Sequence, residues 1–147
     1  IMRGEIIWQK SKGANANFAW GSWLSASNPV IRDIHEYCLV FSKDSMKNSS
    51  GGVSTIEKDE FMESTLSIWN INPEKAKKIG HPAPFPVELP KRFINLYSFK
   101  DDLVLDPFIG SGTTAVASKL MQRNYVGYEI NKDYIEIANK RLQAETS

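Results

Sequence analysis

Two glycines and one acidic residue stand at spacings that suit nucleotide binding. Gly110 and Gly112 follow a short apolar run and precede a segment with helical periodicity. Because neither glycine carries a side chain, such a turn lets the backbone approach a ligand closely. Glu129 follows the next apolar run, close to the spacing at which an acid binds ribose hydroxyls. The combination predicts an adenosine-containing cofactor held between a strand-to-helix turn and the end of the next strand.

Two simpler interpretations remain open at these positions. The glycines could serve only a tight packing of strand against helix, and Glu129 could be an exposed carboxylate at a strand end. The joint spacing of strand, turn, helix and acid favours binding. It does not distinguish a nicotinamide dinucleotide from S-adenosylmethionine, because the same crevice in an α/β fold accommodates both.

Hydrophobic patterning predicts the elements that position these residues. We expect strands at 4–9, 33–41, 64–69, 103–105 and 125–130, and helices at 89–99, 115–121 and 131–142. The run 37–41 lacks polar alternation, which is typical of a strand buried on both faces, and 103–105 is expected to be a short buried strand. The segments 11–28 and 42–60 are expected to be an ordered loop and a solvated excursion. Residues 103–142 form one βαβα unit, which predicts an α/β fold with a parallel sheet.

Composition limits the class of protein. The chain has 147 residues, a formal net charge of +1 and 41% hydrophobic residues, which suits a single globular domain. Its single cysteine, Cys38, and its two histidines, His35 and His81, are too few for a disulfide or a metal site. No apolar stretch is long enough to span a membrane, so we expect a cytoplasmic protein. The balanced charge excludes a strongly basic nucleic-acid binder but allows a local basic face.

The string Asp106-Pro107-Phe108-Ile109-Gly110-Ser111-Gly112-Thr113-Thr114 resembles the cofactor motif of DNA amino-methyltransferases, which modify the exocyclic amine of cytosine or adenine. The segments 81–86 and 127–131 fit the same family, and 8–10 and 35–43 resemble its middle strands. The resemblance is to the subgroup in which the catalytic motif precedes the cofactor motif. It implies a Rossmann-like, S-adenosylmethionine-dependent methyltransferase fold.

The resemblance also implies roles for individual residues. Phe108, Gly110, Ser111 and Gly112 would wrap the methionine end of S-adenosylmethionine, and Glu129 would hold its ribose. The full set of implied cofactor-binding residues is His81, Pro82, Ala83, Phe85, Asp106, Phe108, Gly110, Ser111, Gly112, Thr113, Glu129 and Asn131. Asp106 and the ring of Phe108 would favour the sulfonium cation. As alternatives, Phe108 is a core aromatic and His81 only hydrogen-bonds its own turn.

The catalytic motif of the family is not in this sequence. That motif is Asp or Ser, then two adjacent prolines, then an aromatic residue. The seven prolines here are never adjacent, and the one Asp-Pro pair, Asp106-Pro107, belongs to the cofactor turn. We therefore expect a partial fold in which the N-terminal catalytic strand and loop are missing, with no catalytic residue in this chain. The chain would be a truncated enzyme or one part of a naturally split enzyme, inactive alone.

DNA contact is predicted outside the cofactor motif. Basic residues exceed acidic ones over 72–100, and the candidate DNA-binding residues are Lys75, Lys77, Lys78, Trp20 and Trp23. A solvated charged face and a loop pinned by buried indoles are the plainer alternatives. We expect middle strands with an aromatic loop in 1–43, target recognition in 44–79 and cofactor binding in 80–147.

The sequence thus predicts part of a site-specific DNA methyltransferase, with a slight preference for N4 of cytosine over N6 of adenine. A nicotinamide-dependent oxidoreductase domain and a non-catalytic DNA-specificity subunit remain alternatives. Predicted partners are double-stranded DNA, the missing N-terminal part as a separate chain, and a second copy in a homodimer. We expect no metal ion and an association with the nucleoid.

Overall fold

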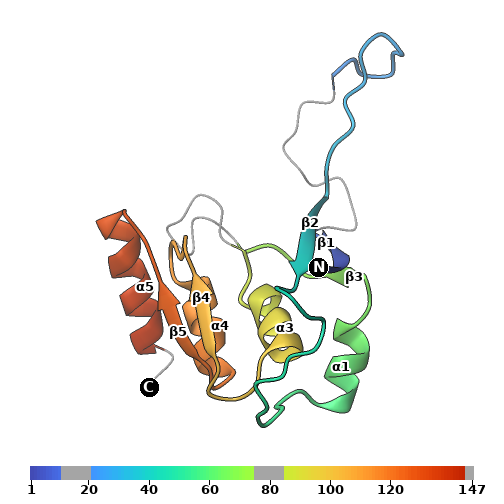
Figure 1. The fold of residues 1–147 in the computed structure, drawn as a ribbon. Coiled ribbons are helices and arrows are strands. Elements are labelled where there is room, and N and C mark those ends of the chain that lie inside the picture. The colour runs from blue at the N-terminus through green and yellow to red at the C-terminus, as the bar shows by residue number, and fades with distance from the viewer. Residues whose placement is uncertain (11–20, 75–84, 145–147) are drawn as a thin grey trace.

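A computed structural model describes residues 1–10, 21–74 and 85–144, and within them the chain forms two small sheets and four helices (Figure 1). In chain order the elements are β1 (Met2–Gln9), β2 (His35–Phe41), α1 (Lys58–Ser64), β3 (Ile68–Asn70), α3 (Glu88–Tyr97), β4 (Leu103–Asp106), α4 (Thr113–Leu120), β5 (Asn124–Gly127) and α5 (Lys132–Ala144). The predicted strands and helices all occur, with shifted ends.

The first sheet has the order β2-β1-β3. β1 pairs antiparallel with β2 and parallel with β3, which sets Trp8 beside Trp69. Trp69 is only 1% exposed, and Trp8 donates its indole N–H to the carbonyl of Ile71 over 2.8 Å. These indoles pack with Ile6, Ile71 and Leu89 into the core cluster, which joins the sheet to α3.

The second sheet consists of β4 and β5, which pair in parallel so that Asp106 lies opposite Gly127. α4 connects the two strands and packs against α3, α5 and β5. Figure 1 shows this unit beside the first sheet, with α3 between them. The predicted βαβα unit is therefore confirmed, and the fold is α/β and Rossmann-like. Both parallel strands end at the same edge, where the glycine turn begins.

The expected burial of β2 on both faces, and of β4, is wrong. Leu103 and Leu105 of β4 are 66% and 60% exposed, and Tyr37 and Leu39 of β2 are exposed as well. Side chains alternate between the faces of a strand, and among the described residues only one face of each strand is covered. In the part of the chain that the structure describes, β2 is also an edge strand and β4 pairs only with β5. Each sheet therefore keeps an apolar face and a strand edge without a described partner.

Within the segment 44–79, the part expected to be a solvated excursion ends at residue 60 and is mostly exposed. The segment also contains α1, which the sequence did not predict, and β3, which begins later than expected. α1 is held by tertiary contacts: Asn95 of α3 donates to Glu60 over 2.8 Å, and Arg92 forms an ion pair of 2.8 Å with Glu63. Local periodicity could not predict a helix of seven residues that depends on such contacts. The proposed role of this segment in target recognition stays a prediction.

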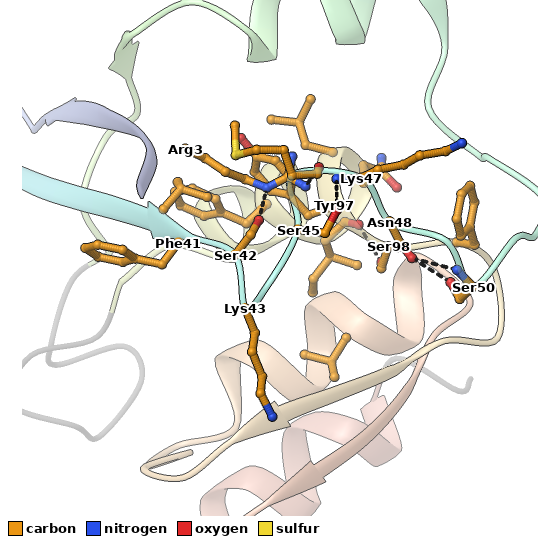
Figure 2. Close-up of a pocket in the computed structure, with 18 of the residues that line it drawn as sticks. Arg3, Phe41, Ser42, Lys43, Ser45, Lys47, Asn48, Ser50, Tyr97 and Ser98 are labelled. Carbon is orange, nitrogen blue, oxygen red and sulfur yellow. Dashed lines mark hydrogen bonds between the residues drawn. The ribbon is translucent and has the colours of Figure 1, made fainter. Parts of the chain in front are cut away.

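A cavity of about 1200 Å³ lies between the end of β2, the loop that follows it, α3 and Val104 of β4 (Figure 2). Arg3 organises its rim by donating to the hydroxyl of Ser42 and the carbonyl of Met46. Its guanidinium also lies 5.2 Å from the centre of the Tyr97 ring. No residue of the glycine turn lines this cavity, so it is separate from the predicted cofactor site.

Candidate cofactor-binding site

The turn between β4 and α4 requires glycine at two positions. Gly110 has φ +51° and Gly112 has φ +81°, both in the left-handed region that other residues rarely adopt. Gly112 also donates its N–H to the carbonyl of Ile109 over 2.9 Å, which closes the turn directly before α4. The first N–H groups of α4 have no partner within the helix, so this end of α4 favours negative or electron-rich groups of a ligand.

Glu129 faces this turn. One carboxylate oxygen accepts the N–H of Gly110 over 3.0 Å, and the other accepts the N–H of Asn131 over 2.8 Å. The sequence predicted that turn and acid would face each other across a gap for an adenosyl group. The carboxylate instead contacts the turn directly, because backbone N–H groups are strong partners for it. Its remaining lone pairs are still able to accept hydrogen bonds from a ligand.

Asp106 holds the other side of the turn. Its carboxylate accepts the N–H of Phe108 over 2.9 Å and the hydroxyl of Thr114 over 2.6 Å. These bonds join the end of β4 to the first turn of α4. The sequence indicated that the charge of Asp106 would favour the sulfonium cation of the cofactor. The hydrogen bonds described here are instead to Phe108 and Thr114 of the protein.

Phe108 is not a core residue. Its side chain is 87% exposed, which excludes the alternative of a core aromatic. Tyr128 and Ile130, after β5, are exposed too, and so is Phe85 ahead of α3. Apolar side chains without a packing role at the carboxyl edge of a parallel sheet are typical of a ligand site.

Gly112 has a packing role as well. A Cβ atom at this position would lie 2.7 Å from the Cβ of Ala138 in α5, so the turn and α5 are in close contact. Gly112 therefore serves tight packing against α5, whereas the interpretation that packing of strand against helix is its only role stays a prediction. The same helix supplies Arg141, which donates to the carbonyl of Ser111 over 2.8 Å and to the hydroxyl of Thr113 over 3.0 Å.

Asn131 caps the start of α5. The side-chain oxygen of Asn131 accepts the N–H of Asp133 over 2.9 Å. Since this oxygen is engaged in the cap, the implied contact of Asn131 with the cofactor would use its amide N–H groups. His81, Pro82 and Ala83 lie outside the described residues, as do Trp20, Lys75, Lys77 and Lys78.

The structure bears on two other expectations about DNA contact, the exposure of Trp23 and the basic stretch 72–100. Trp23 is exposed, so the alternative of a buried indole that pins its loop does not hold for it. Within the basic stretch, Arg92 pairs with Glu63 and Glu88, and Lys91 pairs with Glu88. Burial opposes the charge of Arg92, but its bonds to both glutamates outweigh this and raise its pKa. α3 therefore directs fewer unpaired cations outward than the sequence suggested.

Sequence reasoning missed two residues of the turn's support, Thr114 and Arg141. In the sequence Thr114 stands out only as part of the motif string, and Arg141 stands close to the end of the predicted helix 131–142, where a cation suits the helix dipole. One signal was available for Arg141: it stands three positions after Ala138, hence on the same face of α5. Across 1–10, 21–74 and 85–144 no cluster of ligating side chains could hold a metal ion, and no helix is long and apolar enough to span a bilayer.

The parallel strands, the glycine turn and the acid after β5 define a nucleotide-cofactor domain of the α/β class. A family model described as DNA methylase, N6_N4_Mtase, matches residues 1–140. The chain belongs to this family of DNA methylases. The nicotinamide-dependent alternative thereby loses its support.

Curated relatives agree with the family. The chain is 43% identical over 145 residues to the type II methyltransferase M.BglI of Bacillus subtilis, a match that covers 93% of this chain and 37% of the relative. It is 33% identical over 148 residues to M.MjaI of Methanocaldococcus jannaschii, with 93% and 48% covered. The chain thus spans about half or less of the length of the relatives it matches.

Solved structures share the fold. TTHA0409 of Thermus thermophilus, described as a DNA modification methylase, matches with a TM-score of 0.71 and 28% identity, over 99% of this chain and 56% of its own. Its complex with S-adenosyl-L-methionine matches with a TM-score of 0.68 and 28% identity, over 99% and 54%. M1.HpyAVI, in a complex with the same cofactor, has a TM-score of 0.60 and 26% identity, over 96% and 62%.

Proposed function

We propose that this chain binds S-adenosylmethionine at the turn between β4 and α4, as part of a DNA amino-methyltransferase. The observation that carries the proposal is the hydrogen bond from Gly110 to Glu129, which holds an acid beside a left-handed glycine turn. Two similar structures are complexes with this cofactor, which supports the assignment. S-adenosylmethionine supplies an electrophilic methyl group on a sulfonium.

The residues of the site fit such a cofactor. The open lone pairs of Glu129 accept ribose hydroxyls, as an acid after the second strand does in dinucleotide-binding folds. The exposed ring of Phe108 would favour the sulfonium by a cation–π attraction of roughly 0.5–2 kcal/mol. Ser111, Gly112 and Thr113 would hold the methionine end, and Asp106 fixes the shape of the turn through Phe108 and Thr114.

The acceptor of the methyl group is the exocyclic amine of a base in double-stranded DNA, N4 of cytosine in preference to N6 of adenine. In the duplex such an amine is base-paired and its base is stacked between neighbours, so the base must leave the stack to reach the donor. The exposed Trp23, together with Trp20, Lys75, Lys77 and Lys78, is the candidate DNA-contact set. Target recognition falls to residues 44–79.

Catalysis needs polypeptide beyond these residues. This chain has no Asp or Ser followed by two prolines and an aromatic. The uncovered faces and edges of β2 and β4 favour a further segment that completes the sheet, and Val104 and the end of β2 line the same cavity (Figure 2). We infer that a segment N-terminal in the family's order, in the same or another chain, supplies the catalytic loop. A homodimer is a further arrangement compatible with these open edges.

Calorimetric titrations of the 147-residue chain, one with S-adenosylmethionine and one with NAD, test cofactor binding. We expect weak binding of S-adenosylmethionine alone, since the catalytic segment is missing. Binding of NAD without S-adenosylmethionine would overturn the assignment. Rapid methyl transfer by this chain alone to unmethylated DNA would contradict the need for a further segment. The missing proline pair also fits a non-catalytic specificity subunit. In that case we expect no methyl transfer even after the catalytic segment is added.

A further inference from the structure

We propose that Arg141 is a positioning residue that holds the cofactor-binding turn in its binding shape before the cofactor arrives. The inference rests on the proposed function, because the turn is the proposed cofactor site. Arg141 lies near the end of α5 and acts through Ser111 and Thr113, without touching the cofactor itself.

Three acceptors of the turn converge on one nitrogen of Arg141. Its Nη1 atom lies 2.8 Å from the carbonyl oxygen of Ser111, 3.2 Å from the hydroxyl of Ser111 and 3.0 Å from the hydroxyl of Thr113. Both acceptor residues are buried. Hydrogen bonds from a charged donor to buried acceptors are among the stronger ones in a protein.

These bonds set the orientation of one peptide group. Because a peptide is planar and trans, the carbonyl of Ser111 and the N–H of Gly112 point in opposite directions. Arg141 holds the carbonyl toward α5, and the N–H is held by the carbonyl of Ile109 over 2.9 Å. The peptide is thereby fixed from both ends. A ligand that meets an ordered turn avoids the free-energy cost of ordering it.

A purely structural role for Arg141 makes a different prediction. α5 is already in close contact with the turn through Ala138, whose Cβ leaves no space for a side chain at Gly112. Loss of a residue that only anchors α5 would lower the stability of the whole domain. Loss of a positioning residue would loosen the turn and weaken cofactor binding more than it lowers stability.

The test compares Arg141→Met, which removes the donors, with Lys140→Met, an exposed neighbour on the same helix. Both are made in the 147-residue chain. We expect Arg141→Met to raise the dissociation constant of S-adenosylmethionine about tenfold and to speed amide hydrogen exchange at Gly112 without cofactor. Exchange in β1 serves as the reference for global unfolding. Lys140→Met should change neither quantity.

Arg141→Lys adds a conservative variant. Since the three acceptors share one nitrogen, an ammonium group can replace part of the contact, although its side chain is shorter by one bond. We expect an affinity between those of the wild type and Arg141→Met. The proposal is overturned if Arg141→Met binds S-adenosylmethionine as tightly as the wild type and if the amide of Gly112 exchanges as slowly as in the wild type. If Arg141→Met does not fold, the Lys variant decides, and values equal to the wild type overturn the proposal.

The two proposals fail in distinguishable ways. If the unaltered chain binds no S-adenosylmethionine, the proposed function fails, but exchange at Gly112 still measures whether Arg141 orders the turn. If the chain binds and Arg141→Met binds equally well, only the positioning role fails.

Discussion

The carboxylate of Glu129 lies 3.0 Å from the backbone nitrogen of Gly110, and its second oxygen lies 2.8 Å from that of Asn131. One side chain therefore connects the turn after β4, the end of β5 and the start of α5. Because both bonds are to backbone N–H groups, they depend on the position of the carboxylate and not on the identity of neighbouring side chains. The same group is the proposed ribose ligand.

Glu129→Gln should separate the two tasks of this side chain. The amide oxygen can still accept the N–H of Gly110, but the amide nitrogen cannot accept the N–H of Asn131, so we expect the turn to keep its shape while the melting temperature falls by a few degrees. The loss of charge and of one acceptor should weaken binding of S-adenosylmethionine about tenfold. Calorimetric titration measures this, with the exposed Glu136→Gln on α5 as the control. Unchanged affinity would remove Glu129 from the site.

Phe108→Ala should affect binding without affecting stability. The ring is almost fully exposed, so its removal is expected to change the free energy of unfolding by less than about 0.5 kcal/mol. The lost cation–π attraction predicts a dissociation constant for S-adenosylmethionine raised roughly two- to thirtyfold. Phe41→Ala, at another exposed ring, is the control and should bind normally. An equal affinity in both variants would show that Phe108 does not contact the cofactor.

Gly112→Ala should destabilise the domain strongly. The left-handed backbone costs alanine about 1–2 kcal/mol, and its Cβ would lie 2.7 Å from that of Ala138, an overlap that adds about 1–3 kcal/mol. Gly51→Ala is a matched control, because φ is +69° there but no atom lies near the new Cβ. Urea unfolding should give the larger loss for Gly112→Ala. Adding Ala138→Gly should recover part of the difference.

Arg123→Met should unfold the domain at a lower denaturant concentration. Arg123 is only 4% exposed and donates to Ser98, Thr55 and the carbonyl of Met121, so it joins the ends of α3 and α4. Burial lowers its pKa, partly offset by Asp102 and Asp101. Removal leaves half-buried acceptors without a donor, at a cost of about 1–3 kcal/mol. Lys100→Met, at an exposed site, should cost little in the same urea titration.

Cys38 should react slowly with iodoacetamide. Burial, and to a lesser extent the charge of Glu36, raises the pKa of its thiol. Because the thiolate is the reactive form, less of it is present at pH 8 than in an unfolded chain, and the alkylation rate should rise only at higher pH. It is the single cysteine of the chain, so mass spectrometry reports on it directly. A rate equal to that of the urea-unfolded chain would contradict the prediction.

The sequence predicted the βαβα unit well because its signals are local. Apolar periodicity marked β4, α4, β5 and α5, and the glycines marked the turn between them. Burial could not be predicted in the same way. The apolar runs of β2 and β4 are suited to strands with two covered faces, but coverage depends on which other elements are present.

The residues that support the turn could not be predicted from the sequence either. Arg141 meets Ser111 across 30 positions of the chain, and Glu60 meets Asn95 across 35. Such contacts depend on the angles at which helices pack, which no short pattern records. The acid at position 129 was found because its spacing from the turn is set by one helix and one strand.

The close approach of Gly112 to Ala138 has a consequence for how the domain tolerates change. There is no free space between residues 112 and 138, so a larger side chain at either position requires α5 to move outward. An outward movement of α5 would carry Arg141 away from the loop it restrains. Substitutions on the buried side of this helix should therefore alter ligand affinity without contacting the ligand. Substitutions at 112 and 138 should covary among related sequences.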